Sequence, residues 1–434
     1  MAGTALPTET FQKTAPGSFG RQKLVQLAGR YSLSAIGPIA TSGAHFAASL
    51  IFLHRMEQAE FGLFSFLLVV VPFGLSISSG LLCAPLVSAI NKPGTVGEGE
   101  RAAFRAVNRV YSLIVGLVTA VLMYTSKAGD VSSVLLGFYG AAMTMRWFSR
   151  SNAYYLSHPL RASASDLVYS LSLVGGLVLL IAIGHLTMEF ASAVLMTSAL
   201  LGLLPFGWEF LRLQLLPIEK KAFRLYGPIW RDITRWSLMG VALSEITANA
   251  HAYVVTFFAG AQAFAVLAAG ALLMRPLMLV LTALPDRERP VMGRALAAGD
   301  IESAFATRNE FRIASAVAWL GTVLLSAGIL IWFPQLIVRT GFDHREVEVV
   351  VAIWALIVAV RTARTADATF LQAACEFNGL ARAGLPAGIA SLAMTLALLL
   401  TLGPVASLGG ILAGELVTTV NIFALMRKWK RDHA

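Results

Sequence analysis

The sequence predicts an all-α membrane protein with about twelve transmembrane helices, and three observations support this fold class. Of the 434 residues, 57% are hydrophobic and only 13% are charged, whereas a soluble domain usually has about 25% charged residues. The mean hydropathy is +0.71. The apolar residues are gathered in runs of about 20, which is the length that crosses a bilayer as a helix.

Each predicted span is a mostly apolar run that ends in polar or charged residues. The predicted spans are 33–53, 62–84, 109–126, 130–149, 166–185, 191–210, 237–258, 261–284, 313–334, 348–372, 384–402 and 407–426. The connections between them are short, so we expect no separate soluble domain.

The basic residues indicate how the spans are oriented. Twenty-seven of the 34 Lys and Arg residues fall in the two termini and in alternate connections, including Arg146, Arg150, Arg308 and Arg312. The opposite side has four. Basic residues favour cytoplasmic loops, so both termini are predicted to be cytoplasmic, as an even number of spans requires. The net charge of +10 therefore reflects orientation, and we expect no nucleic-acid partner.

A weak internal repeat divides the chain into two halves. Span two ends in Ala84-Pro85 and span eight in Leu284-Pro285, and each is followed by a basic, polar stretch. The turns Glu60-Phe61-Gly62 and Ala259-Gly260-Ala261 hold equivalent positions in the two halves. We therefore predict two six-helix lobes, 1–216 and 217–434, as parallel repeats around a central cavity. Such lobes suit transport by alternating access.

Arginines inside the spans are candidates for substrate binding. Arg275 lies midway along span eight, before Pro276. A charge inside the bilayer is costly, so the side chain is expected to face a cavity, where its planar fork would suit a phosphate. The alternative is a structural ion pair with Glu245 of span seven.

Span ten contains Arg361, Arg364 and Asp367, at intervals of three residues that place neighbours on one helix face. Two arginines with one acid leave an excess positive charge, which favours an anion. The alternative is an Arg364–Asp367 bridge with side chains that extend to the cytoplasmic end.

Carboxylates and histidines inside the spans are candidates for coupling to an ion gradient. They are Glu245, Asp367, Glu415 and His45. The alternative for each is a structural hydrogen bond or ion pair.

Motifs for chemistry on soluble substrates are missing. The sequence has no GxxxxGK[ST], HExxH or GxSxG motif. Its two cysteines, Cys83 and Cys375, have no metal-ligand spacing. We therefore expect a transporter and not an enzyme, with no cofactor and no metal. The predicted outer loops are too small for the catalytic loop of a polysaccharide polymerase or ligase.

The stretch from Phe52 to Phe64 resembles the first hairpin of Wzx-like polysaccharide flippases, in which an apolar helix, a polar turn and Glu-Phe-Gly precede an aromatic-rich helix. That family belongs to the MOP (multidrug/oligosaccharidyl-lipid/polysaccharide) exporter superfamily. Span eight, which ends at Pro285 before a basic stretch containing Gly299-Asp300, is also similar to the family. The resemblance covers the layout of the whole chain, but the lipid II flippases of the superfamily usually have fourteen spans.

The resemblance implies a flippase that moves undecaprenyl-diphosphate-linked oligosaccharide, a polysaccharide repeat unit such as that of lipopolysaccharide or exopolysaccharide, across the bacterial inner membrane. It implies a cationic central cavity with Arg275 at a matching position. The partners would be the lipid-linked oligosaccharide, membrane lipids and other polysaccharide assembly proteins. The alternatives are a cation-coupled multidrug (MATE-like) exporter, a membrane-embedded polymerase or ligase, and a membrane scaffold.

Overall fold

The computed structural model describes residues 21–83, 85–86, 98–156, 158–215, 220–338 and 342–433, and within these ranges the secondary structure is entirely helical. An N-terminal group comprises α1 (Arg21–Arg55), α2 (Gln58–Ser78), α4 (Glu98–Thr125), α5 (Asp130–Tyr155), α6 (Pro159–Ala182), α7 (Met188–Leu201) and the short α8 (Trp208–Leu215). A C-terminal group comprises α10 (Arg235–Phe258), α11 (Ala261–Ala297), α12 (Ile301–Trp332), α13 (His344–Ala373), α14 (Phe377–Leu402) and α15 (Leu408–His433).

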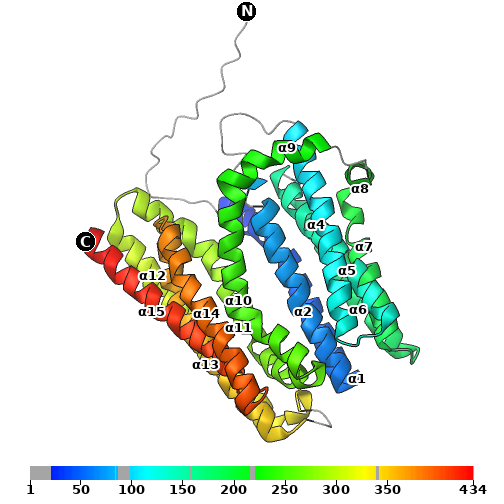
Figure 1. Ribbon diagram of the computed structural model, residues 1–434. Coiled ribbons are helices and arrows are strands. Elements are labelled where there is room, and N and C mark those ends of the chain that lie inside the picture. Colours follow the sequence, from blue (N-terminus) through cyan, green and yellow to red (C-terminus); the bar gives the residue numbers. More distant parts are fainter. Residues whose placement is uncertain are drawn as a thin grey trace, which may run out of the picture.

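Short helical elements complete the described chain. The π-helical turn η1 (Ser79–Cys83) extends α2, and α9 (Lys220–Ile229) with η3 (Trp230–Thr234) precedes α10. Two 3-10 turns, η2 (Leu204–Phe206) and η4 (Pro334–Leu336), follow α7 and α12. α9 lies at one end of the molecule and packs on α4 (Figure 1).

Twelve helices of 14 or more residues in the described part of the chain match the twelve predicted spans in order. Eight of them are long and apolar enough to cross a membrane. The other four are α1, α5, α10 and α13, which contain His45, Arg146, Glu245 and Arg361. An ionisable group in hydrocarbon is costly, so these four helices need protein neighbours around their polar faces.

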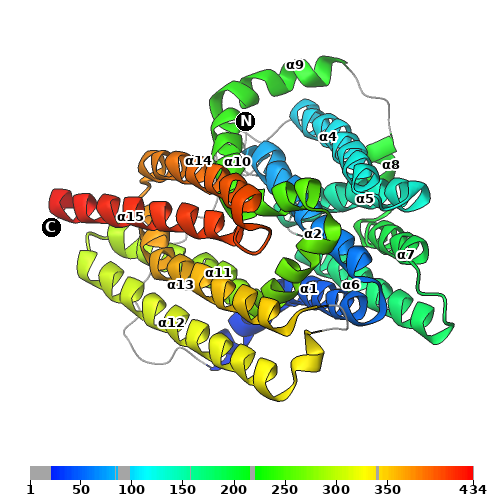
Figure 2. The ribbon, with the colours of Figure 1, turned by 60° about the horizontal axis from the view of Figure 1, so that its bottom comes forward.

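The two groups of helices lie side by side, with α2 and α10 between the remaining helices (Figure 1; Figure 2). Within the N-terminal group α5 packs on α4 and α7, and α1 packs on α6. Within the C-terminal group α11 packs on α13, and α14 on α15. Between the groups, α2 packs on α11 and α10. The predicted boundary at 216/217 falls in residues 216–219, outside the described residues, and the division into two domains stays a prediction.

The Glu-Phe-Gly turn lies where the two groups meet, at the end of the molecule opposite to α9 (Figure 1). The Glu60 carboxylate accepts a hydrogen bond from the backbone N–H of Glu57 at 3.0 Å and so caps α2. Phe61 is buried. A Cβ on Gly62 would overlap the backbone carbonyl of Ala261. The two turns that the repeat made equivalent are therefore in direct contact.

Several helices extend beyond the predicted spans. α11 continues through Pro285 to Ala297, and α12 begins at Ile301 instead of 313. Arg308 and Arg312 consequently lie within a helix, and Arg146 and Arg150 lie within α5, which corrects their assignment to connecting loops. The reason is that arginine is a good helix former, so a charged residue does not end a helix where the apolar run ends.

Candidate functional site

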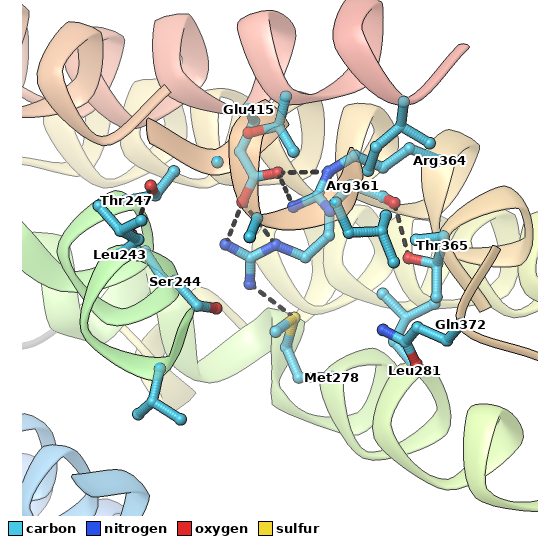
Figure 3. Close-up of a pocket in the computed structure, with 18 of the residues that line it drawn as sticks. Leu243, Ser244, Thr247, Met278, Leu281, Arg361, Arg364, Thr365, Gln372 and Glu415 are labelled. Carbon is cyan, nitrogen blue, oxygen red and sulfur yellow. Dashed lines mark hydrogen bonds and ion pairs between the residues drawn. The ribbon is translucent and has the colours of Figure 1, made fainter. Parts of the chain in front are cut away.

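A cavity of about 770 Å³ opens among α10, α11, α13, α14 and α15. Its walls are mainly small, apolar and hydroxyl side chains, among them Ser244, Thr247 and Thr365. Its charged lining residues in the described chain are Arg361, Arg364 and Glu415, which we call the arginine–glutamate triad (Figure 3). Two guanidinium groups and one carboxylate give the cavity an excess positive charge.

The triad is held together by four short hydrogen bonds. Arg361 donates from Nε and Nη2 to Glu415 Oε1, at 2.8 and 2.6 Å. Arg364 donates from the same two atoms to Glu415 Oε2, at 3.0 and 2.6 Å. Glu415 is only 1% exposed, and the two arginine side chains are 18% and 19% exposed. The carboxylate is thus fully engaged, while both arginines still reach the cavity.

Local sequence explains why α15 can place Glu415 here. A Cβ on Gly414 would lie 2.7 Å from the Cβ of Ser391 on α14, so the residue before Glu415 must be small. Asn421, six residues after Glu415, donates to the backbone carbonyl of Ala383 and so ties α15 to α14 at a second level. Together these contacts fix the depth at which Glu415 meets α13.

The triad retains donors for an anionic ligand. A guanidinium group has five N–H donors, and each arginine directs its Nε and one Nη2 proton to Glu415. The other edge of Arg361 lies against Met278, with Nη1 3.8 Å from the sulfur, a weak acceptor (Figure 3). Glu415 therefore orients two forks whose remaining N–H groups suit phosphate oxygens.

Arg275 lies apart from this cavity. It is on α11, facing α1, where Nη1 donates to Ser49 Oγ at 3.1 Å and lies 3.5 Å from the His45 carbonyl. No carboxylate in the described ranges pairs with it. The alternative bridge to Glu245 is not formed, because Glu245 instead accepts a hydrogen bond from Asn249 at 2.7 Å. The structure therefore brings two of the three predicted arginines together and places the third between the helix groups.

Asp367, predicted next to Arg364 on α13, pairs with α12 instead. Its partners are Arg308, at 3.4 Å, and Arg312. The alternative Arg364–Asp367 bridge is thus not formed, since Arg364 is turned to Glu415. Arg361, Arg364 and Asp367 share one helix, yet their charges belong to two separate clusters.

A third cluster was missed by the sequence reasoning. Asp166 of α6 is 1% exposed and pairs with Arg146 and Arg150 of α5, at 2.9 and 3.0 Å. The spacing of four between Arg146 and Arg150, and again between Arg308 and Arg312, was the available signal. Residues four apart share a helix face, so each pair can surround one carboxylate.

The predicted coupling candidates differ in their surroundings. Asp367 and Glu415 each have two arginine partners. His45 Nε2 lies 2.6 Å from the Tyr169 hydroxyl, which lies 3.0 Å from that of Tyr139. Glu245 has no cationic partner within ion-pair distance among the described residues. No described group of three or more His, Cys, Asp or Glu side chains could hold a metal ion.

Comparison with known proteins places the fold. No protein-family model matches the chain. No curated protein matches it. Several solved structures match the chain in fold. An inward-facing multidrug resistance MATE family transporter of the MOP superfamily has a TM-score of 0.66 and 11% identity, covering 92% of this chain and 98% of that one. The lipid II flippase MurJ in an inward closed conformation has a TM-score of 0.66 and 10% identity, covering 91% and 87%.

A third match is a MOP superfamily transporter from Pyrococcus furiosus, described as having a binding pocket of reverse polarity; its TM-score is 0.54 at 16% identity, covering 91% of this chain and 93% of that one. The chain thus has the fold of MOP superfamily transporters, and the predicted fold class is confirmed. The likeness to an outward-facing MATE family transporter is weaker, with a TM-score of 0.56.

Proposed function

We propose that this protein is a flippase that moves undecaprenyl-diphosphate-linked oligosaccharide across the bacterial inner membrane by alternating access, with both termini in the cytoplasm. The observation that carries the proposal is the cavity with the arginine–glutamate triad, which has an excess positive charge inside a MOP transporter fold. A diphosphate carries the opposite charge. The partners proposed with this function are membrane lipids and other polysaccharide assembly proteins.

The geometry of the cavity suits binding of different parts of the substrate by different residues. The diphosphate binds the N–H groups of Arg361 and Arg364 that do not contact Glu415. Hydroxyl and amide groups such as Ser244, Thr365 and Gln372 line the same cavity and can hydrogen-bond to sugar hydroxyls. The polyprenyl tail stays in lipid. Rocking of the two helix groups then exposes the head group on the other side, and no covalent bond changes.

The test replaces the two cavity arginines by glutamine and measures lipid-linked oligosaccharide on each leaflet of the inner membrane. We expect Arg361→Gln and Arg364→Gln to cause accumulation on the cytoplasmic leaflet and loss of export. Arg345→Gln is the matched control, because Arg345 is an exposed arginine at the other end of α13. Normal export by the Arg361→Gln/Arg364→Gln double variant would overturn the proposal.

Glu245 is proposed as the group that couples transport to an ion gradient, because it is the coupling candidate that has a carboxylate and no arginine partner in the described structure. We expect export by Glu245→Gln to be insensitive to an uncoupler. Its rate should be low and equal to the export rate of wild-type cells treated with the uncoupler. Glu348→Gln, at an exposed position, should leave the uncoupler response unchanged. A full uncoupler response in Glu245→Gln would remove Glu245 from this role.

A second candidate function is cation-coupled multidrug export, and the observation that favours it is the likeness to MATE family structures. The excess positive charge of the cavity opposes it, since a cationic drug would be repelled. Uptake of a cationic dye in a deletion strain separates the two functions. Equal dye retention with and without the gene supports the flippase, and increased retention on deletion supports drug export.

A further inference from the structure

A second cavity, of about 560 Å³, lies in the N-terminal group, between α4, α5, α6 and α8. It shares no lining residue with the central cavity. Among the described residues that line it are three arginines, Arg101 and Arg105 from α4 and Arg161 from α6, and one acid, Glu209. The described lining is therefore strongly cationic, and His158 adds a further hydrogen-bonding group.

Tertiary contacts build the walls of this cavity. Arg161 Nη1 donates to the Phe206 carbonyl at 3.2 Å, and Arg109 Nη1 donates to the Gln214 carbonyl at 3.2 Å. These two bonds tie η2 and α8 to α6 and α4. Gly207 has a φ of +92°, a conformation that favours glycine, and it turns the chain so that α8 closes the cavity.

The rim of the cavity is apolar and exposed. Trp208, the first residue of α8, lines the cavity and is 73% exposed. Leu204 and Leu160, close in sequence to the lining residues Phe206 and Arg161, are 57% and 64% exposed. Leu160 lies at the start of the candidate span Pro159–Ala182, and Trp208 follows the end of the candidate span Met188–Phe206. The ends of spans are where tryptophan meets the lipid head groups, so we expect Trp208 at that level. A cationic interior beside a lipid-facing apolar rim fits an amphiphile and does not fit a soluble anion.

We propose that this cavity is a binding site for an anionic glycerophospholipid. The lipid phosphate is held by Arg105 and Arg161, and the acyl chains pass over Trp208 into the bilayer. The volume falls within the range of about 300–1,000 Å³ that is usual for specific ligand pockets. The site is independent of the central cavity, so this lipid is a resident ligand and is not the transported molecule.

The test uses the full-length protein in a neutral detergent, with phosphatidylglycerol or phosphatidylcholine added. We expect phosphatidylglycerol to raise the thermal unfolding midpoint and to be retained in native mass spectra. Each of Arg105→Gln and Arg161→Gln should weaken its apparent affinity about fivefold, the usual effect of one basic residue near an anionic lipid. Arg212→Gln, on α8 but outside the cavity lining, is the control and should match the wild type.

A second variant keeps every charged residue and fills the cavity with a larger side chain. Asn152 lines the cavity, and Asn152→Trp should abolish retention of phosphatidylglycerol while leaving the unfolding midpoint without lipid close to that of the wild type. Three results would overturn the proposal. The first is equal retention of phosphatidylglycerol by the wild type and all variants. The second is equal stabilisation by inorganic phosphate or glycerol phosphate. The third is retention of undecaprenyl phosphate but not of phosphatidylglycerol, which would indicate a binding site for the transported lipid.

Discussion

In the described part of the chain, three carboxylates inside the helix bundle are each paired with two arginines: Asp166, Asp367 and Glu415. All three are 1% exposed at the side chain. A buried carboxylate with one cationic partner would be neutral as a pair, whereas two partners leave a net positive charge. Only the Glu415 cluster turns that charge towards the central cavity, which is why the substrate proposal rests on it.

Removal of Glu415 should destabilise the protein. Glu415→Ala leaves two arginines without their counter-ion, and breaking a buried ion pair costs about 3–5 kcal/mol. We expect a clear drop in the unfolding midpoint in detergent. Glu348→Ala is the control, because Glu348 is 50% exposed and its ion-pair partner among the described residues is His344, a contact worth about 1 kcal/mol or less.

A companion variant separates stability from transport. In Arg361→Met/Arg364→Met/Glu415→Leu the whole triad becomes apolar, and such replacements are often neutral for stability. We expect the triple variant to fold and to have lost export. A triple variant that folds and still exports would show that the cavity charge serves structure alone.

At the scale of the helix, capping and small residues determine where each element begins and how closely it packs. Glu60 caps α2, and Asp300 caps α12 by accepting the backbone N–H of Ser303 at 2.9 Å. Gly414 lets α15 approach α14 beside Glu415. These local features orient the helices that line the central cavity.

The cap of α12 makes a pH-dependent contribution to stability. Hydrogen bonds from the Ser303 side chain and backbone lower the pKa of Asp300 below its usual range. A carboxyl with a lowered pKa in the folded state stabilises above its unfolded pKa, and this contribution is lost as the pH falls through the folded value. The unfolding midpoints of the wild type and Asp300→Ala should therefore differ at pH 7, and the difference should begin to shrink only below about pH 4, as the pH falls through the folded pKa of Asp300. A difference that stays constant down to about pH 1, below both pKa values, would contradict this account.

At the scale of the whole molecule, the two helix groups are in contact at the end opposite to α9. Gly62 meets Ala261 there, and the Gln58 and Gln262 side chains lie 3.4 Å apart at their amide nitrogen and oxygen. The two contacting turns are those that the predicted internal repeat makes equivalent. The proposed mechanism of alternating access requires this contact to separate when the molecule opens towards that side.

A side chain at residue 62 should hold the two groups apart at this end. Gly62→Leu places atoms where the Ala261 carbonyl lies, so we expect a longer distance between spin labels at Gln58→Cys and Gln262→Cys in a background without Cys83 and Cys375. Gly175→Leu is the control, because open space surrounds Gly175. An unchanged distance in Gly62→Leu would show that this end does not open at the Gly62–Ala261 contact.

The sequence by itself determined the helical fold class, the order of the twelve long helices and part of the list of costly charges inside them, since Asp166 and its arginine partners were missed. Hydropathy over about 20 residues is a local property, so each span could be recognised without knowing its neighbours. The Glu-Phe-Gly turn is also a local pattern, so it can be recognised in the sequence. Only the structure shows that Glu60 caps α2, that Phe61 is buried and that Gly62 lies against Ala261.

Only the tertiary structure decided which charges meet. Glu415 lies 54 and 51 residues from its two arginine partners, and Asp367 lies 55 residues from Arg312. No local pattern encodes such pairs, because they depend on the depth and rotation of helices that are distant in the sequence. For the same reason Arg275, which the sequence grouped with Arg361 and Arg364, lies on a face of α11 turned to α1 and outside the central cavity.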